Sequence, residues 1–215
     1  MRPFASDPSA SERRDAPVKT IRLLTAFFVS AFFVLSVYAQ DSAKKSAAPN
    51  PAASQSAGLL KQWNEIGRKL IAMSEDYPED KYDTKVAPTT GTFAQRMIHA
   101  AAANYYFTNL ANGQKAPGEE DPPRKQFKDK LAIVAYVKKS FADGAAAIKS
   151  KGNQGMSTLV IDPFAEDNPA NANKEHIRLE DLAYALVEHS GECYGQLTVY
   201  YRVGGSIPPE SRPKK

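Results

Sequence analysis

One stretch of the sequence is almost free of charge, and it restricts the fold more than any other. Residues 92–111 read TFAQRMIHAAAANYYFTNLA, and Arg96 is the only charged residue among them. A helix of this composition is apolar around most of its circumference, and such a helix is mostly buried. We therefore expect residues 92–111 to form a helix in the interior of a domain.

Three further segments have the periodicity of amphipathic helices. The first ends before Pro78, the second is about seven turns long, and the third spans residues 178–202. The first two carry these apolar stripes: Leu59, Trp63, Ile66, Leu70 and Met73, then Phe127, Leu131, Val134, Val137, Phe141, Ala145 and Ile148. No strand-like alternation competes with them. The sequence therefore predicts an all-α fold, a four-helix bundle. Residues 151–177 form a long, irregular link before the last helix, which suits a crossover or a lid.

The N-terminal segment has the parts of an export signal. Lys19 and Arg22 precede an uncharged apolar run over residues 23–37, and the small-residue pattern Val37-Tyr38-Ala39 follows. These features predict a secretory signal peptide that is cleaved after Ala39, and hence a periplasmic or secreted protein. The alternative is an inner-membrane anchor formed by residues 23–39, although the run is slightly short for a spanning helix.

The remaining sequence divides by composition. Residues 1–39 are the leader, residues 40–57 are an Ala/Ser/Pro-rich flexible linker, residues 58–205 are the folded domain, and residues 206–215 are a C-terminal tail. The formal net charge of the whole chain is only +4, and part of it comes from the leader. We see no basic patch of the kind that binds phosphates, so we expect no nucleic-acid partner.

The last predicted helix carries the residues that are best suited to chemistry. Its stripe contains His189 and Cys193, which lie at i and i+4 and therefore one above the other. Zinc accepts both ligand types, and His99 on the almost uncharged helix is the natural third ligand. His176 lies in the long link and is less suited. Three protein ligands leave one coordination position open, as in catalytic zinc sites, where the ion activates a water or a thiol.

A simpler interpretation stands beside the metal site. A histidine in a core stripe is often satisfied by a hydrogen bond, and a free cysteine often behaves as a small buried hydrophobe. Cys193 is the only cysteine, so it cannot form a disulfide within the chain. A third alternative is a redox-linked homodimer through Cys193, which a buried position disfavours. Glu188 and Glu192 flank the stripe and are candidates to orient a ligand, although exposed helix positions explain them as simply.

Three segments together resemble the DinB/YfiT-like family, whose members are regarded as metalloenzymes, and in particular its exported bacterial members. They are GLLKQWNEIGRKLIAMSEDYPEDKYDTK, TFAQRMIHAAAANYYF and LEDLAYALVEHSGECYGQLTVYYRVGGSIPPESR, and the resemblance covers about residues 58–212. It implies a four-helix bundle with an up-down-down-up path, which we attribute to the link at 151–177. It also implies a metal-binding triad of histidines. His99 and His189 match two of them, and Cys193 occupies the place of the third.

We therefore expect one divalent ion, zinc before nickel or another metal, held by His99, His189 and Cys193 in a pocket partly covered by residues 151–177. The family resemblance suggests a hydrolase or a thiol transferase acting on a small electrophilic molecule. The sequence indicates neither a catalytic residue nor a substrate. The alternative is a non-catalytic bundle with a degenerate metal site that binds a ligand or partner in the cell envelope.

Overall fold

The computed structural model describes residues 54–118, 121–165 and 176–214. The expected leader and most of the expected linker lie outside these residues. The described part contains four long α-helices: α2 (Gln55–Asp76), α3 (Phe93–Ala111), α4 (Lys130–Met156) and α5 (Leu179–Val203). The all-α fold class is thus confirmed. The first helix begins at Gln55, three residues before the expected start of the domain. No helix among the described residues is long and apolar enough to cross a membrane.

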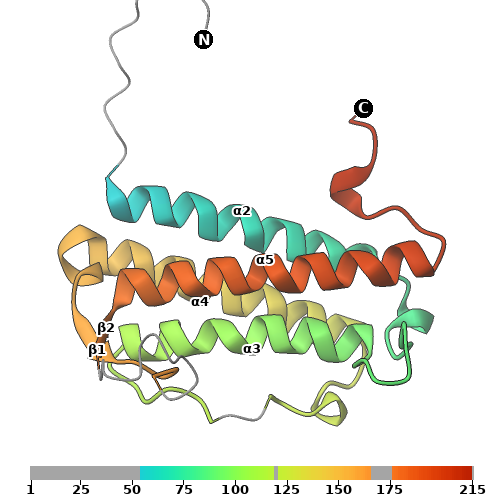
Figure 1. The fold of residues 1–215 in the computed structure, drawn as a ribbon, viewed down its shortest axis with the longest axis horizontal. Helices are drawn as coiled ribbons and strands as arrows, with labels where there is room; N and C mark the ends of the chain where they lie inside the picture. The colour runs from blue at the N-terminus through green and yellow to red at the C-terminus, as the bar shows by residue number, and fades with distance from the viewer. Residues whose placement is uncertain (1–53, 119–120, 166–175, 215) are drawn as a thin grey trace, which may run out of the picture. The chain divides into compact units, whose positions relative to one another are not determined.

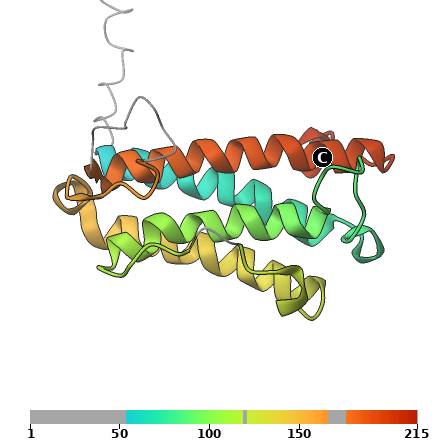
Figure 2. The same cartoon turned by 60° about the horizontal axis from the view of Figure 1, so that its bottom comes forward.

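The helices form an up-down-down-up bundle (Figures 1 and 2). Helices α2 and α5 run in one direction, and α3 and α4 run in the other. Each of α2 and α3 packs mainly against α4 and α5, so α2 lies diagonally opposite α3, and α4 lies diagonally opposite α5. The buried helix α3 therefore shares one long interface with α4 and another with α5.

The connection that makes this path possible differs from the one expected. Because α3 and α4 are parallel neighbours, the chain must return along the length of the bundle between them, and residues 112–129 do so (Figure 1). The link at 151–177, to which the sequence analysis attributed the path, instead joins two antiparallel helices at one end. Its length does not serve the return, and the attribution was wrong.

That link is also more regular than expected. Helix α4 continues to Met156 beyond a break at Gly152, whose φ of 56° lies in the left-handed region that favours glycine. Two short strands follow, β1 (Leu159–Ile161) and β2 (His176–Arg178), which pair antiparallel in the register Leu159 to Arg178. The sequence shows no strand-like alternation here and did not predict this hairpin.

The helix starts follow the local sequence. Thr92 caps α3: its hydroxyl accepts from the Gln95 N–H, and the Gln95 side chain accepts from the Thr92 N–H, which completes a capping box. Asp129 caps α4 by accepting from the Ala132 N–H at 2.9 Å. These caps place the first residues of both helices close to the positions expected from the sequence.

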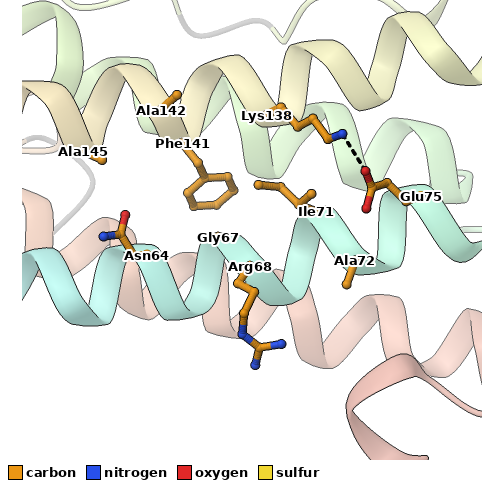
Figure 3. Close-up of a pocket in the computed structure, with 10 residues that line it drawn as sticks. All are labelled: Asn64, Gly67, Arg68, Ile71, Ala72, Glu75, Lys138, Phe141, Ala142 and Ala145. Carbon is orange, nitrogen blue, oxygen red and sulfur yellow. Dashed lines mark ion pairs between the residues drawn. The ribbon is translucent and has the colours of Figure 1, made fainter.

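Close packing of α2 against α4 depends on two glycines. Figure 3 shows Phe141 of α4 lying over Gly67 of α2, where a Cβ atom would come within 2.8 Å of the phenyl ring. The Trp63 indole fills the corresponding space beside Gly144 and donates to the Phe141 carbonyl at 2.9 Å.

One residue of the expected apolar stripe of α4 is not buried. Leu131 lies in the first turn of the helix and is 73% exposed, so that part of the prediction was wrong.

The C-terminal residues dock onto α2. Arg212 binds the Asp76 carboxylate with both terminal nitrogens, at 2.8 and 2.5 Å. Arg68 binds Glu210 in the same forked manner, at 2.6 and 2.8 Å. Bidentate arginine–carboxylate pairs fix geometry well. The segment predicted as a tail is therefore held against the bundle at Glu210 and Arg212.

Candidate metal site

The three sequence-predicted ligands meet at the interface of α3 and α5. His99 lies on α3, and His189 and Cys193 lie on consecutive turns of α5. One ligand atom from each residue lies within 4.8 Å of the other two. The rings of His99 and His189 meet edge to face with centroids 5.0 Å apart. Residues 90 positions apart in the sequence are thus brought together by the antiparallel packing of two neighbouring helices.

These distances suit a shared ion. Zinc bonds of about 2.0 to 2.3 Å to nitrogen and sulfur keep two ligand atoms no more than about 4.4 Å apart. The Sγ atom of Cys193 lies 3.5 Å from Nε2 of His189, inside this limit. A separation near 4.8 Å closes with a small side-chain rotation. Two imidazole nitrogens and one sulfur are also a donor set that zinc accepts, so the residues present fit the metal.

Burial differs across the site. Cys193 is 1% exposed, whereas the side chains of His99 and His189 are 35% and 31% exposed. The thiol therefore lies at the bottom of the site, and the imidazoles line its open side. A molecule approaching from solvent would meet the imidazole edges first.

Burial also controls the protonation of the two α5 groups. It raises the pKa of the Cys193 thiol to about 11, against the opposing charge of Arg96. Burial and then the nearby His99 lower the pKa of His189. At neutral pH, a protonated thiol therefore donates to a neutral Nε2. A metal ion would compete with this thiol proton for the same position, because thiolate is the ligand form.

His99 has a partner that the sequence analysis missed. Its Nδ1–H donates to Oδ2 of Asp121 at 2.8 Å, since an ionised carboxylate can only accept. This bond leaves Nε2 of His99 free to bind an ion, the arrangement usual for metal-binding histidines. Asp121 belongs to the 112–129 crossover, so only the path of that connection brings it to the site.

The crossover beside Asp121 is anchored. Pro122 and Pro123 follow directly and restrict the backbone. Arg124 then binds both carboxylate oxygens of Asp83, at 2.9 and 3.1 Å, and donates to the Phe127 carbonyl at 2.6 Å. The carboxylate of Asp121 is therefore held in place from the side of the α2–α3 connection.

The other sequence candidates lie at different distances from the centre. Glu192 places a carboxylate oxygen 3.7 Å from Nδ1 of His189, with its side chain 61% exposed. His176 is exposed on β2 and lines a pocket of about 560 Å³ beside the hairpin, together with Leu159 and Ile161. It does not join the other two histidines. Residues 166–175 of the link lie outside the described residues, so its expected role as a cover stays a prediction.

A second pocket lies on the opposite side of the bundle, between α2 and α4 (Figure 3). It has a volume of about 450 Å³ and is lined by residues of α2 and α4. The Lys138–Glu75 ion pair, 2.5 Å long, lies at one end. Its lining residues include neither histidine nor cysteine. The chemistry of the described residues is thus concentrated at the α3–α5 interface.

No protein-family model matches the sequence, and no curated protein matches it either. Among solved structures, the crystal structure of a DinB-like protein from Bacillus cereus is similar, with a TM-score of 0.55 and 19% sequence identity. The match covers 71% of this chain and 94% of that chain. At this identity the likeness concerns the fold. The chain thus combines the fold of a DinB-like protein with a His/His/Cys grouping of the kind that can hold a metal ion.

Proposed function

We propose that this protein binds one divalent metal ion, most suitably zinc, through His99, His189 and Cys193. We propose further that it acts as a hydrolase or transferase on a small electrophilic substrate. The observation that carries the proposal is the convergence of the three ligand atoms within 4.8 Å. When bound, the ion supplies Lewis-acid chemistry and lowers the pKa of a water or thiol in its open coordination position.

The chain's own residues divide the remaining work. His189 and Cys193 provide two donors from adjacent turns of one rigid helix. Asp121 holds the imidazole of His99 with Nδ1 protonated and Nε2 free. The partly exposed imidazoles leave the solvent side open for a small molecule. Together these features provide an accessible, oriented site with an open position.

Metal analysis tests the proposal. Protein purified without a chelating tag, loaded with zinc and dialysed, is expected to retain about one ion per chain. His189→Ala and Cys193→Ala are expected to lose the ion. His176→Ala is the matched control, because this histidine lies on the exposed face of β2, and it is expected to retain the ion. A metal content of the wild-type protein that is no higher than background would overturn the proposal.

One observation favours the alternative, a non-catalytic bundle that binds a ligand or partner. Cys193 and His189 satisfy each other by a hydrogen bond within a buried stripe. In that case Cys193→Ala lowers only the stability, by about 1 kcal/mol, and metal content is the same with and without the thiol. The metal analysis above therefore separates the two functions.

We also propose that residues 1–39 export the protein. The support is the basic flank, the apolar run over residues 23–37 and the small-residue pattern ending at Ala39. N-terminal sequencing of the protein recovered from the cell envelope is expected to begin at Gln40. An intact chain in the membrane fraction would instead support the anchor formed by residues 23–39.

A further inference from the structure

The only charged residue of α3 lies beside the candidate metal site. Arg96 occupies the first turn of the helix, three positions before His99 and therefore on the same face. It is partly buried. A cation is unfavourable in a first turn, because the helix dipole is positive there. Burial adds a desolvation cost. The position of Arg96 thus has two costs that its own helix does not offset.

No other residue in the described ranges offsets them either. Within residues 54–118, 121–165 and 176–214, the side chain of Arg96 has no hydrogen bond or ion pair. By contrast, four other arginines bind a carboxylate: Arg68, Arg124, Arg178 and Arg212. Arg202 has no such partner among these residues, but it is exposed and lies in the last turn of α5, where the dipole favours a cation. Of the arginines that the structure describes, only Arg96 combines partial burial with an unused guanidinium.

The guanidinium lies at the α3–α5 interface, near the start of α3. A Cβ atom built on Gly91 would be 3.7 Å from Nε of Arg96, so this side chain folds back toward the start of α3. That start is tied to α5 by the hydrogen bond from the Tyr200 hydroxyl to the Gly91 carbonyl. Arg96 is also near enough to Cys193 for its charge to act on the thiol. The cation therefore lies between the Tyr200 end of the α3–α5 interface and the His/His/Cys grouping.

We propose that Arg96 is the binding group for an oxyanion of the substrate, a carboxylate or a phosphate. A guanidinium presents donors in a fork that matches both anions. The substrate would then place its anionic group on Arg96 and its electrophilic centre one helical turn away, at the open side of the His99 and His189 imidazoles. Only the placement of the electrophilic centre at the imidazoles rests on the proposed function. Anion binding by Arg96 does not require the ion.

Nuclear magnetic resonance of the full-length, metal-free protein tests the proposal. Acetate and inorganic phosphate are titrated separately at constant ionic strength. The backbone amide signals of Gln95 and Met97 are followed in the wild type and in every variant, and in the wild type the Nε–H signal of Arg96 is followed as well. At least one anion is expected to shift these signals saturably, and Arg96→Gln is expected to weaken the binding roughly tenfold. Acetate alone indicates a carboxylate, and phosphate alone indicates a phosphoryl group. No saturable shift with either anion overturns the inference.

Matched variants make the result specific. Arg202→Gln removes the same charge from the exposed end of α5 and is expected to leave anion binding unchanged. Equal losses in Arg96→Gln and Arg202→Gln would overturn the inference, because they would indicate a general charge effect. Arg96→Lys is expected to recover part of the affinity, since it keeps the charge without the fork.

Zinc stoichiometry separates this inference from the proposed function. Arg96→Gln is expected to bind zinc as the wild type does, because Arg96 supplies no ligand. If the wild type binds zinc but neither anion, the anion site is refuted and the metal site stands. If Arg96-dependent anion binding occurs without zinc binding, the anion site stands and the metal-dependent function is refuted.

Discussion

The imidazole of His99 donates its Nδ1–H to the carboxylate of Asp121 over 2.8 Å. This contact joins the buried helix α3 to the crossover that returns the chain to α4. It selects one tautomer of His99 and limits rotation of the ring, so Nε2 is left free for an ion. The His99 imidazole therefore has the tautomer and the orientation that a metal ligand requires before an ion binds.

Asp121→Asn is expected to weaken zinc binding by about 10- to 100-fold, the usual effect of losing a carboxylate behind a metal-binding histidine. The amide is neutral, so it supports the Nδ1–H tautomer less strongly than the carboxylate does. Competition with a chromophoric chelator measures the affinity. Glu188→Gln is the control, because it removes one exposed carboxylate next to His189 in the sequence. The same loss in both variants would show that only overall charge matters.

Cys193→Ser is expected to abolish the sulfur signature of the site while the fold is retained. Cobalt(II) bound to the wild type should show a thiolate-to-metal charge-transfer band in the near ultraviolet, because the ligand form of Cys193 is the thiolate. Serine is nearly the same size, so the packing around the 1% exposed position changes little. His176→Ala should keep the band. A wild-type cobalt spectrum without a sulfur band would contradict the assignment of Cys193 as a ligand.

The sequence predicted the helices well because their signals are local. The almost uncharged run at residues 92–111 corresponds to Phe93–Ala111, and the last pattern, at 178–202, corresponds to Leu179–Val203. His189 and Cys193 were placed together by helical spacing alone. His99 required the additional assumption that two helices pack side by side, and the structure brings it within reach of both.

What the sequence missed depends on contacts between distant segments. The length of a connection does not show which helices are parallel, so the return path was assigned to 151–177 instead of 112–129. Asp121 was missed for the same reason. The β1–β2 hairpin has strands of three residues, and Leu159, Val160 and Ile161 are all apolar, so no alternation marks it. Leu131 continues the stripe of α4 at a position where the structure leaves it 73% exposed.

Gly144→Ala is expected to destabilise the bundle by about 3 kcal/mol, at the upper end of the cost of overpacking. The added Cβ would lie 2.1 Å from Cζ2 of Trp63. This indole is fully buried and is fixed by its bond to the Phe141 carbonyl. Either α4 or the indole must therefore move. Chemical denaturation monitored by tryptophan fluorescence measures the change.

Gly195→Ala on α5 is the matched control for Gly144→Ala. Nothing lies within 4 Å of its added Cβ, so only helix propensity changes, and a gain of about 0.5 to 1 kcal/mol is expected. Opposite signs for the two substitutions would support the close approach of α2 and α4. A similar small effect for both would show that the interface has room at Gly144.

The ion pair between Asp76 and Arg212 predicts a pH-dependent part of the stability. The guanidinium of Arg212 holds the pKa of Asp76 below its usual value, against a smaller opposing effect of burial. Above the unfolded-state pKa of about 3.9 the pair contributes fully. As the pH falls through the lower folded-state pKa, the carboxyl is protonated in the folded protein as well and the contribution is lost.

Asp76→Asn is therefore expected to cost about 1 kcal/mol at pH 7, because the pair is bidentate but largely exposed. The difference from the wild type should shrink toward zero as the pH falls below about 4. Urea unfolding at a series of pH values measures it. Asp80→Asn, an exposed carboxylate without an ion pair in the described part of the chain, should change the unfolding free energy little at either pH. A difference for Asp76→Asn that stays constant down to acid pH would mean that its cost comes from packing and not from the charge, and Arg212→Gln at pH 7 would then cost much less than Asp76→Asn.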